Sequence, residues 1–163
     1  MFPKAVRDLA EAVLQRARAR GAMLATAESC TGGLVSGALT AIPGSSDVLD
    51  RGFVTYSNAA KVQMLGVPEA LIAAHGAVSE PVARAMAGGA LKVSGAGVAV
   101  SITGVAGPGG GSADKPVGLV HFAVARTDRP SLHREMGFGD IGREAVRLAS
   151  VRVALEMLLE AMG

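Results

Sequence analysis

The sequence has no tryptophan, one tyrosine and only four phenylalanines among its 163 residues. An interior with so few aromatic rings must be filled by small aliphatic side chains, and half of the residues are hydrophobic. The 22 glycines let backbones approach closely, since glycine has no Cβ. This composition excludes a disordered chain and is typical of helices packed on a parallel or mixed sheet.

Cysteine is equally scarce, because Cys30 is the only one and an intramolecular disulfide is therefore excluded. The first residues lead directly into charged, amphipathic sequence and not into the apolar run of a secretory signal. We therefore expect a cytoplasmic location. The three histidines, His75, His121 and His133, lack metal-ligand spacing, so we expect no metal site.

Charge of one sign is not concentrated anywhere. The chain has 16 basic and 14 acidic residues, interspersed without a basic run, which argues against nucleic-acid binding. The longest uncharged stretch, 93–113, could span a bilayer by length, but glycines and Pro108 interrupt it repeatedly. We expect no membrane span.

Periodicity and turn residues predict alternating helices and strands. The predicted helices are 4–20, 31–42, 58–65 with Asn58 as N-cap, 68–75, 79–95 and 143–162; the predicted strands are 23–27, 52–56, 98–102 and a hairpin of 117–125 with 132–138. This order predicts a single domain over residues 1–163 with an α/β fold, a three-layer α/β/α sandwich with a mixed sheet. The order of the strands in the sheet stays open.

The segment 27–33 leads from a predicted strand into a predicted helix, at the sheet edge where α/β proteins bind ligands. It places the hydroxyl of Ser29 beside the free N–H groups of Cys30, Thr31, Gly32 and Gly33. Such groups can bind an anion or an oxyanion. The alternative is that Ser29 or Thr31 only caps the helix.

A second candidate constellation is Tyr56 to Lys61. If Asn58 is the N-cap, Lys61 occupies position N3, where the positive end of the helix dipole opposes its charge. A lysine so placed and partly desolvated has a lowered pKa and can act as a base toward a serine, with Tyr56 relaying the proton. The alternative is a solvated surface lysine and an ordinary strand aromatic.

The glycine-rich segment 104–111 lacks the lysine of a phosphate-binding P-loop and fails the dinucleotide fingerprint at Ser112. It can wrap a ligand with backbone N–H groups, together with Thr103, or form a flexible loop. Arg143, at the start of the last predicted helix, is either a phosphate ligand or a surface cation.

Taken together, four segments resemble the CinA C-terminal-domain family, whose enzymatic members are nicotinamide-nucleotide amidohydrolases. They are Thr26-Ala27-Glu28-Ser29-Cys30-Thr31-Gly32-Gly33, Gly52-Phe53-Val54-Thr55-Tyr56-Ser57-Asn58, His75-Gly76-Ala77-Val78-Ser79-Glu80, and Gly104 to Gly111 with Lys115-Pro116-Val117-Gly118. One departure is that the family's Gly-Asp-Arg sequence is two residues longer here, Gly139-Asp140-Ile141-Gly142-Arg143.

The resemblance implies hydrolysis of the carboxamide of nicotinamide mononucleotide to nicotinic acid mononucleotide and ammonia, without a metal or other cofactor. It implies a catalytic Ser29 and Lys61 assisted by Tyr56, with an oxyanion held near Cys30, Thr31, Gly32 and Gly33. We expect the ring and ribose phosphate to lie against Gly44, Ser45, Ser46, Thr103 and Gly104, with Arg143 as a further phosphate ligand.

Two other functions remain open from the sequence. One is a pyridine-nucleotide-sensing or partner-binding module without turnover, since a fold and a pocket do not establish catalysis. The other is an amidase that uses Cys30 as the nucleophile, although a lone cysteine after a strand is more often buried and inert. In each case we expect a small-molecule pyridine nucleotide as partner, no nucleic acid, no membrane, and a homo-oligomer.

Overall fold

The structure, a computed structural model, describes residues 1–163 and contains one five-stranded sheet in the order β2-β1-β3-β4-β5. The strands are β1 (Leu24–Glu28), β2 (Leu49–Val54), β3 (Val98–Gly104), β4 (Leu119–Arg126) and β5 (Leu132–Gly137). The first three are mutually parallel, whereas β4 and β5 are antiparallel additions at one side. The predicted mixed sheet, with the hairpin at an edge, is confirmed.

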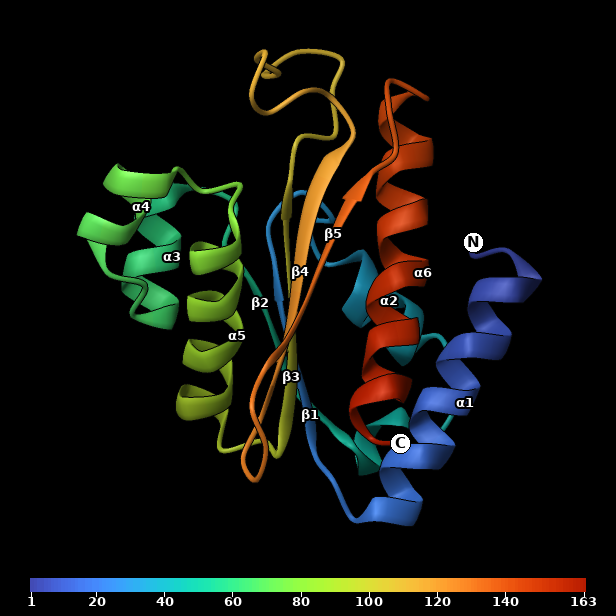
Figure 1. Cartoon of the computed structure of the whole chain (residues 1–163). Coiled ribbons are helices and arrows are strands. Elements are labelled where there is room, and N and C mark those ends of the chain that lie inside the picture. Colours follow the sequence, from blue (N-terminus) through green and yellow to red (C-terminus); the bar gives the residue numbers. More distant parts are fainter.

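Six helices cover the two faces of the sheet (Figure 1). One face carries α1 (Lys4–Arg20), α2 (Leu34–Thr40) and α6 (Arg143–Ala161), and the other carries α3 (Asn58–Leu65), α4 (Glu69–His75) and α5 (Glu80–Ser94). The predicted three-layer α/β/α arrangement is therefore confirmed. None of these helices combines the length and apolar character that a membrane crossing requires.

The core is divided by the sheet into two parts, both built mainly from small aliphatic side chains as the composition predicts. The larger part packs α1, α2 and α6 against one face and the smaller part packs α5 against the other. Packing is close enough to require glycine at position 89 in α5, where a Cβ would lie 2.0 Å from the Leu65 carbonyl oxygen of α3. Backbone approach, and not aromatic bulk, holds the layers together.

Two predicted element boundaries are wrong in ways that affect the site. Helix α2 begins at Leu34, because Gly32 and Gly33 have positive φ angles of 56° and 98° and form a turn before it. Helix α3 is capped by Ser57, whose hydroxyl accepts the Ala60 N–H at 3.0 Å, so Asn58 is its first residue and not the cap. The capping residue that binds a free N–H at the helix start is therefore one residue earlier in the chain than expected.

The register of the parallel strands determines which segments meet at the site. Glu28, the last residue of β1, pairs with Val54 of β2 and with Ile102 of β3. The three strands therefore finish at the same end of the sheet, and the residues that follow them are neighbours. In Figure 1 the long loop between β3 and β4 extends beyond the strands of the sheet.

Candidate active site

Ser29 is held at the end of β1 by backbone pairing. Its N–H donates to the Ile102 carbonyl of β3 at 2.9 Å, and its side chain is nearly buried, with 8% of the residue surface exposed. The strand pairing continues for one residue beyond β1, which fixes the backbone of Ser29 and the direction of its Cα–Cβ bond. A serine on such a rigid support can keep its Oγ aimed at a bound ligand.

Lys61 of α3 approaches Ser29 next to the end of the neighbouring strand, β2. Its Nζ lies 3.1 Å from Ser29 Oγ and donates to the Thr55 carbonyl oxygen at 2.9 Å. The residue is only 1% exposed and forms no ion pair with any carboxylate. A buried lysine without an acidic partner is costly, which points to a functional reason for its position.

Burial lowers the pKa of Lys61 below its ordinary value, because desolvation disfavours the ammonium form. The position of Lys61 on α3 differs from the prediction by one residue, since Ser57 as the N-cap puts it at N4 and not at N3. Side chains on a helix lean toward its N-terminus, and this lean brings Nζ back to the strand end at Thr55. Desolvation, and not the helix dipole, is therefore the main cause of the lowered pKa.

Tyr56 also borders the site, but its hydroxyl is directed elsewhere. The residue is 61% exposed, and its hydroxyl accepts a hydrogen bond from Arg143 Nη2 at 2.9 Å. Arg143 Nη1 in turn donates to the Gly107 carbonyl at 2.8 Å. No hydrogen bond joins the Tyr56 hydroxyl to Ser29 or Lys61, so a proton-relay role for this tyrosine stays a prediction.

A cavity of about 280 Å³ is lined by Ser29, Tyr56 and Arg143, whereas Lys61 lies behind Ser29 and outside the lining. Its lining is glycine-rich and consists of Ser29, Cys30, Tyr56, Val78, Gly104, Val105, Ala106, Gly107, Gly109, Gly110 and Arg143. Arg143 is the one cationic residue of this lining, so an anionic group on a ligand is favoured at its end of the cavity.

Cys30 lines the same cavity, but its thiol is a poor nucleophile. Burial raises its pKa to about 12, so the thiol stays protonated near neutral pH. This electrostatic environment favours Ser29 over Cys30 as the attacking group.

The oxyanion donors differ from those expected at a helix start. The carboxylate of Glu28 is fully buried and accepts the N–H groups of Val35 and Ser36 at 2.9 and 3.0 Å, which occupies the start of α2. In the preceding turn, Gly32 N–H donates to the Ser29 carbonyl at 3.0 Å. The N–H groups of Cys30, Thr31 and Gly33 have no acceptor within the protein, and of these three residues only Cys30 lines the cavity.

Three predicted substrate-binding residues, Gly44, Ser45 and Ser46, lie outside the site. They precede β2, whose first residue pairs with the first residue of β1, whereas Ser29 follows the last residue of β1. The length of β1 therefore separates them from the cavity, and we do not retain them as ligands. The predicted loop is present, but because β2 runs parallel to β1, the loop that precedes β2 lies at the opposite end of the sheet from Ser29.

The remaining predicted binding residues have mixed positions. Gly104 lines the cavity, whereas Thr103 is buried and donates to the Ala77 carbonyl at 2.9 Å, so it supports the segment that carries Val78. Thr31, Gly32 and Gly33 shape the turn after Ser29 without lining the cavity. Arg143 does line it, despite the two extra residues that precede it in this sequence.

Two further residues near the site, Glu28 and Arg147, were not among the predicted site residues. Glu28 fixes the start of α2, and Arg147 of α6 donates to the carbonyls of the turn after Ser29. A carboxylate just before a glycine turn and a helix start was the available signal for Glu28. Arg147 is 117 residues from Cys30 along the chain, and no local pattern indicates the contact.

His121 and His133 lie away from this cavity and are hydrogen-bonded to each other, with Nδ1 of one and Nε2 of the other 2.9 Å apart. No group of three or more histidine, cysteine, aspartate or glutamate side chains is arranged to hold a metal ion.

The sequence and the fold were compared with known proteins. Residues 6–162 match the family described as the CinA C-terminal domain. The nicotinamide-nucleotide amidohydrolase PncC of Escherichia coli (strain K12) is 55% identical over 152 residues, which are 93% of this chain and 91% of that protein. A CinA-like protein of Anaeromyxobacter sp. (strain K) is 51% identical over 97% of this chain, but the match covers only 38% of that longer protein.

A solved structure shares both fold and sequence. The competence/damage inducible protein CihA from Agrobacterium tumefaciens superposes with a TM-score of 0.96 at 56% identity, covering 98% of this chain and 97% of that one.

Proposed function

The chain belongs to the CinA C-terminal domain family, and we propose that it is a nicotinamide-nucleotide amidohydrolase that converts nicotinamide mononucleotide and water to nicotinic acid mononucleotide and ammonia. The similarity to the E. coli amidohydrolase extends over nearly the full length of both chains, which supports the same reaction class. The observation that carries the proposal is the buried contact of 3.1 Å between Lys61 Nζ and Ser29 Oγ.

In the proposed mechanism, neutral Lys61 takes the proton of the Ser29 hydroxyl as Oγ attacks the carboxamide carbon. The tetrahedral intermediate places its negative oxygen against the free N–H of Cys30. The C–N bond then breaks, the proton on Lys61 passes to the leaving nitrogen, and ammonia departs. An ester between Ser29 and the nicotinoyl group remains.

The second half of the reaction reuses the same groups. Lys61 takes a proton from a water molecule, the hydroxide attacks the ester carbon, and the Ser29 oxygen leaves with the proton from Lys61. The product is a carboxylic acid, which loses its proton to water and leaves as a carboxylate, and Ser29 and neutral Lys61 are restored. A buried amine with a lowered pKa suits this role, because it must be unprotonated near neutral pH to start each half.

The substrate is oriented in this proposal by the rest of the cavity. The exposed ring of Tyr56 offers a face to the pyridinium ring, which is an aromatic cation. Arg143 and the N–H groups of the loop after Gly104 receive the phosphate. Binding energy from the phosphate can then help to hold the carboxamide carbon over Ser29.

Ammonia release from three substrates tests the proposal: nicotinamide mononucleotide, its riboside without the phosphate, and nicotinamide alone. We expect the mononucleotide to be clearly the best, with formation of nicotinic acid mononucleotide confirmed by chromatography. Binding of the nucleotide without any turnover would instead support a nucleotide-sensing module. Equal rates on all three compounds would show that the cavity does not recognise phosphate.

Oligomeric state and location are separate proposals. We propose a homo-oligomer and a cytoplasmic enzyme, which light scattering of the purified protein and cell fractionation test directly.

A further inference from the structure

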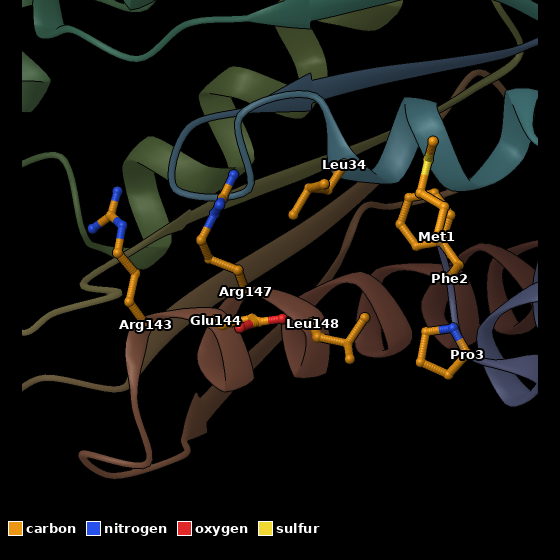
Figure 2. Close-up of a pocket in the computed structure, with 8 residues that line it drawn as sticks. All are labelled: Met1, Phe2, Pro3, Leu34, Arg143, Glu144, Arg147 and Leu148. Atoms are coloured by element: carbon orange, nitrogen blue, oxygen red, sulfur yellow. The ribbon is translucent and has the colours of Figure 1, made fainter.

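Arg147 is a charged residue of α6 that the mechanism above does not use. It lies one helical turn after Arg143, and its guanidinium donates from Nε to the Cys30 carbonyl at 3.1 Å and from Nη2 to the Thr31 carbonyl at 3.2 Å. Figure 2 shows the side chain extending from α6 toward the loop that precedes α2. Arg147 forms no ion pair, so its charge is directed at these two carbonyls.

We propose that Arg147 is a positioning residue that holds the turn after Ser29 so that the N–H of Cys30 faces the reacting carbonyl oxygen. The inference rests on the proposed amidohydrolase function and deepens it, because it assigns the preorganisation of the oxyanion donor to a residue of a distant helix.

The geometry of the peptide bond carries the first step of the argument. A trans peptide is planar, with its C=O and N–H pointing in opposite directions. Because the Thr31 carbonyl is bound to Arg147, the N–H of the same peptide, which belongs to Gly32, points away from the guanidinium and donates to the Ser29 carbonyl. Likewise, the Ser29 carbonyl accepts Gly32 N–H inside the turn, so the Cys30 N–H points out of it.

The second step is that little else holds this part of the turn. The Cys30 carbonyl accepts a hydrogen bond from Arg147 only. The Thr31 carbonyl accepts from both Arg147 and the Leu34 N–H, the latter at 3.0 Å. Two glycines with positive φ follow, and such residues cost little to rearrange. Without Arg147, the Cys30 carbonyl loses its only hydrogen bond, and the turn that carries the Cys30 N–H is held less firmly.

Electrostatics add to the orientation. Hydrogen bonds from a guanidinium are charge-assisted, and they polarise the peptides that accept them, which strengthens the N–H groups on the far side as donors. The fixed positive charge behind the turn also favours a negative oxygen in front of it. These effects act on the transition state more than on the bound substrate, so they affect kcat more than KM.

The substitution Arg147→Ala tests the inference. We expect kcat to fall about 10²-fold, the size of effect seen when one oxyanion donor is lost, with KM changed less than about 3-fold. Arg152→Ala is the matched control, because Arg152 lies on the same helix and is exposed, with only a long ion pair to Glu156 at 3.7 Å. We expect the control to keep wild-type kcat.

A cavity beside Arg147 allows a chemical-rescue experiment. Rescue of kcat by added guanidinium is not expected if Arg147 has only a structural role. The cavity has a volume of about 580 Å³ and is lined by Met1, Phe2, Pro3, Leu34, Arg143, Glu144, Arg147 and Leu148 (Figure 2). Removal of the Arg147 side chain enlarges this space up to the turn, so free guanidinium ion can enter it. We expect guanidinium, below denaturing concentrations, to raise kcat of Arg147→Ala at least about 10-fold, the scale of one charge-assisted hydrogen bond, and potassium at equal ionic strength to have no effect.

Three results would overturn the inference. They are wild-type kcat in Arg147→Ala, a loss of kcat that guanidinium does not restore at all, and an equal loss in Arg152→Ala. Should Arg147→Ala fail to fold, Arg147→Lys replaces it. A lysine is shorter and lacks the planar set of N–H groups with which the guanidinium holds both carbonyls, so kcat about 10-fold below wild type supports the inference and full activity contradicts it.

The rate at which a fluorophosphonate labels Ser29 separates this inference from the proposed function. Labelling needs an activated serine and an oxyanion site, but no nucleotide. Wild-type protein that is labelled but does not hydrolyse the mononucleotide would contradict the proposed substrate alone, and slower labelling of Arg147→Ala would still support the inference. Hydrolysis by the wild type with equal labelling of both proteins would contradict the inference alone.

Discussion

Two places in this molecule bury basic side chains and lower their pKa values, but only one has the surroundings of an active site. At the end of the parallel strands, Lys61 contacts a serine hydroxyl beside a cavity. On the antiparallel strands, His121 of β4 and His133 of β5 stack on each other with ring centroids 5.2 Å apart. Burial is the first cause of the lowered pKa in all three residues.

The neighbours make the difference. The histidine pair contacts Glu135 and Glu80, each at 3.6 Å, and it has no nucleophile beside it. Lys61 has no carboxylate to compensate its charge, and its nearest polar side chain is the hydroxyl that it would activate. A lowered pKa by itself therefore does not identify a catalytic group, whereas a lowered pKa together with a nucleophile and a cavity does.

The strongest contrast between the two regions is expected from removal of the nucleophile. Ser29→Ala should lower kcat by about 10⁴-fold or more, because no covalent intermediate can form. His133→Gln should keep kcat within about 2-fold, a change worth less than 0.5 kcal/mol. Steady-state ammonia release at saturating nucleotide measures both.

Cys30→Ala should also keep most of the activity. If Cys30→Ala were inactive and Ser29→Ala active, the thiol would be the nucleophile.

Lys61 should come next in size. Lys61→Arg retains a positive charge that cannot be released near neutrality, so we expect kcat to fall about 10³-fold, and Lys61→Met should be similarly inactive. If Lys61 only bound phosphate, Lys61→Arg would keep kcat and raise KM. That outcome would leave Ser29 without an identified base.

The lowered pKa of Lys61 predicts the direction in which kcat and stability change with pH. Since the pKa of Lys61 is lowered in the folded state, the neutral amine is lost as pH falls through that pKa, and kcat should fall with it. Between the folded and unfolded pKa values the unfolded chain binds more protons, so stability should rise with pH in this window. Lys61→Met removes both effects. A pH profile of kcat and of the melting temperature, compared between wild type and variant, measures them.

Arg143 should affect binding more than chemistry. Because it is the cation of the cavity lining, Arg143→Ala should raise KM for the mononucleotide about 10-fold or more, the scale of one charge-assisted hydrogen bond, and hardly change KM for the riboside. Arg143→Lys serves as the charge-preserving control. An equal rise for both substrates would mean that Arg143 acts through Tyr56 or Gly107 and does not contact phosphate.

The smallest effect should come from the histidine pair. The pKa values of His121 and His133 are lowered by burial, so below pH 6.5 the unfolded chain binds more protons and stability falls as the pH falls. Glu80 and Glu135 oppose this shift, whereas Arg84 and Lys115 add to it. His133→Gln should flatten the loss of melting temperature between pH 6.5 and 5 by a few degrees, without altering the pH profile of kcat. A changed kcat profile would connect the two regions.

Local patterns in the sequence were sufficient to predict the helices and strands and to propose many of the site residues. Strand periodicity and glycine punctuation predicted β1 and the turn after it, and the same stretch contains Ser29. The long helix α6 was predicted to within one residue at each end. The start of α2 was wrong because Gly32 and Gly33 form a turn before it, and the cap of α3 was wrong because two polar residues compete for it, Ser57 and Asn58. Either residue can accept the helix-start N–H, so the sequence alone does not choose between them.

By itself, the sequence determined the α/β class and a core made of small side chains, because each of these depends on composition or on neighbouring residues. It offered Ser29 and Lys61 as candidates, and the family resemblance implied that they act together. Only the tertiary structure decided which end of the sheet each loop occupies, and so removed Gly44, Ser45 and Ser46 from the site. It also brought Arg147 to the turn after Ser29 and His121 to His133. Strand order and register set these contacts, and they follow from burying both faces of one sheet, a requirement that no short stretch of sequence expresses.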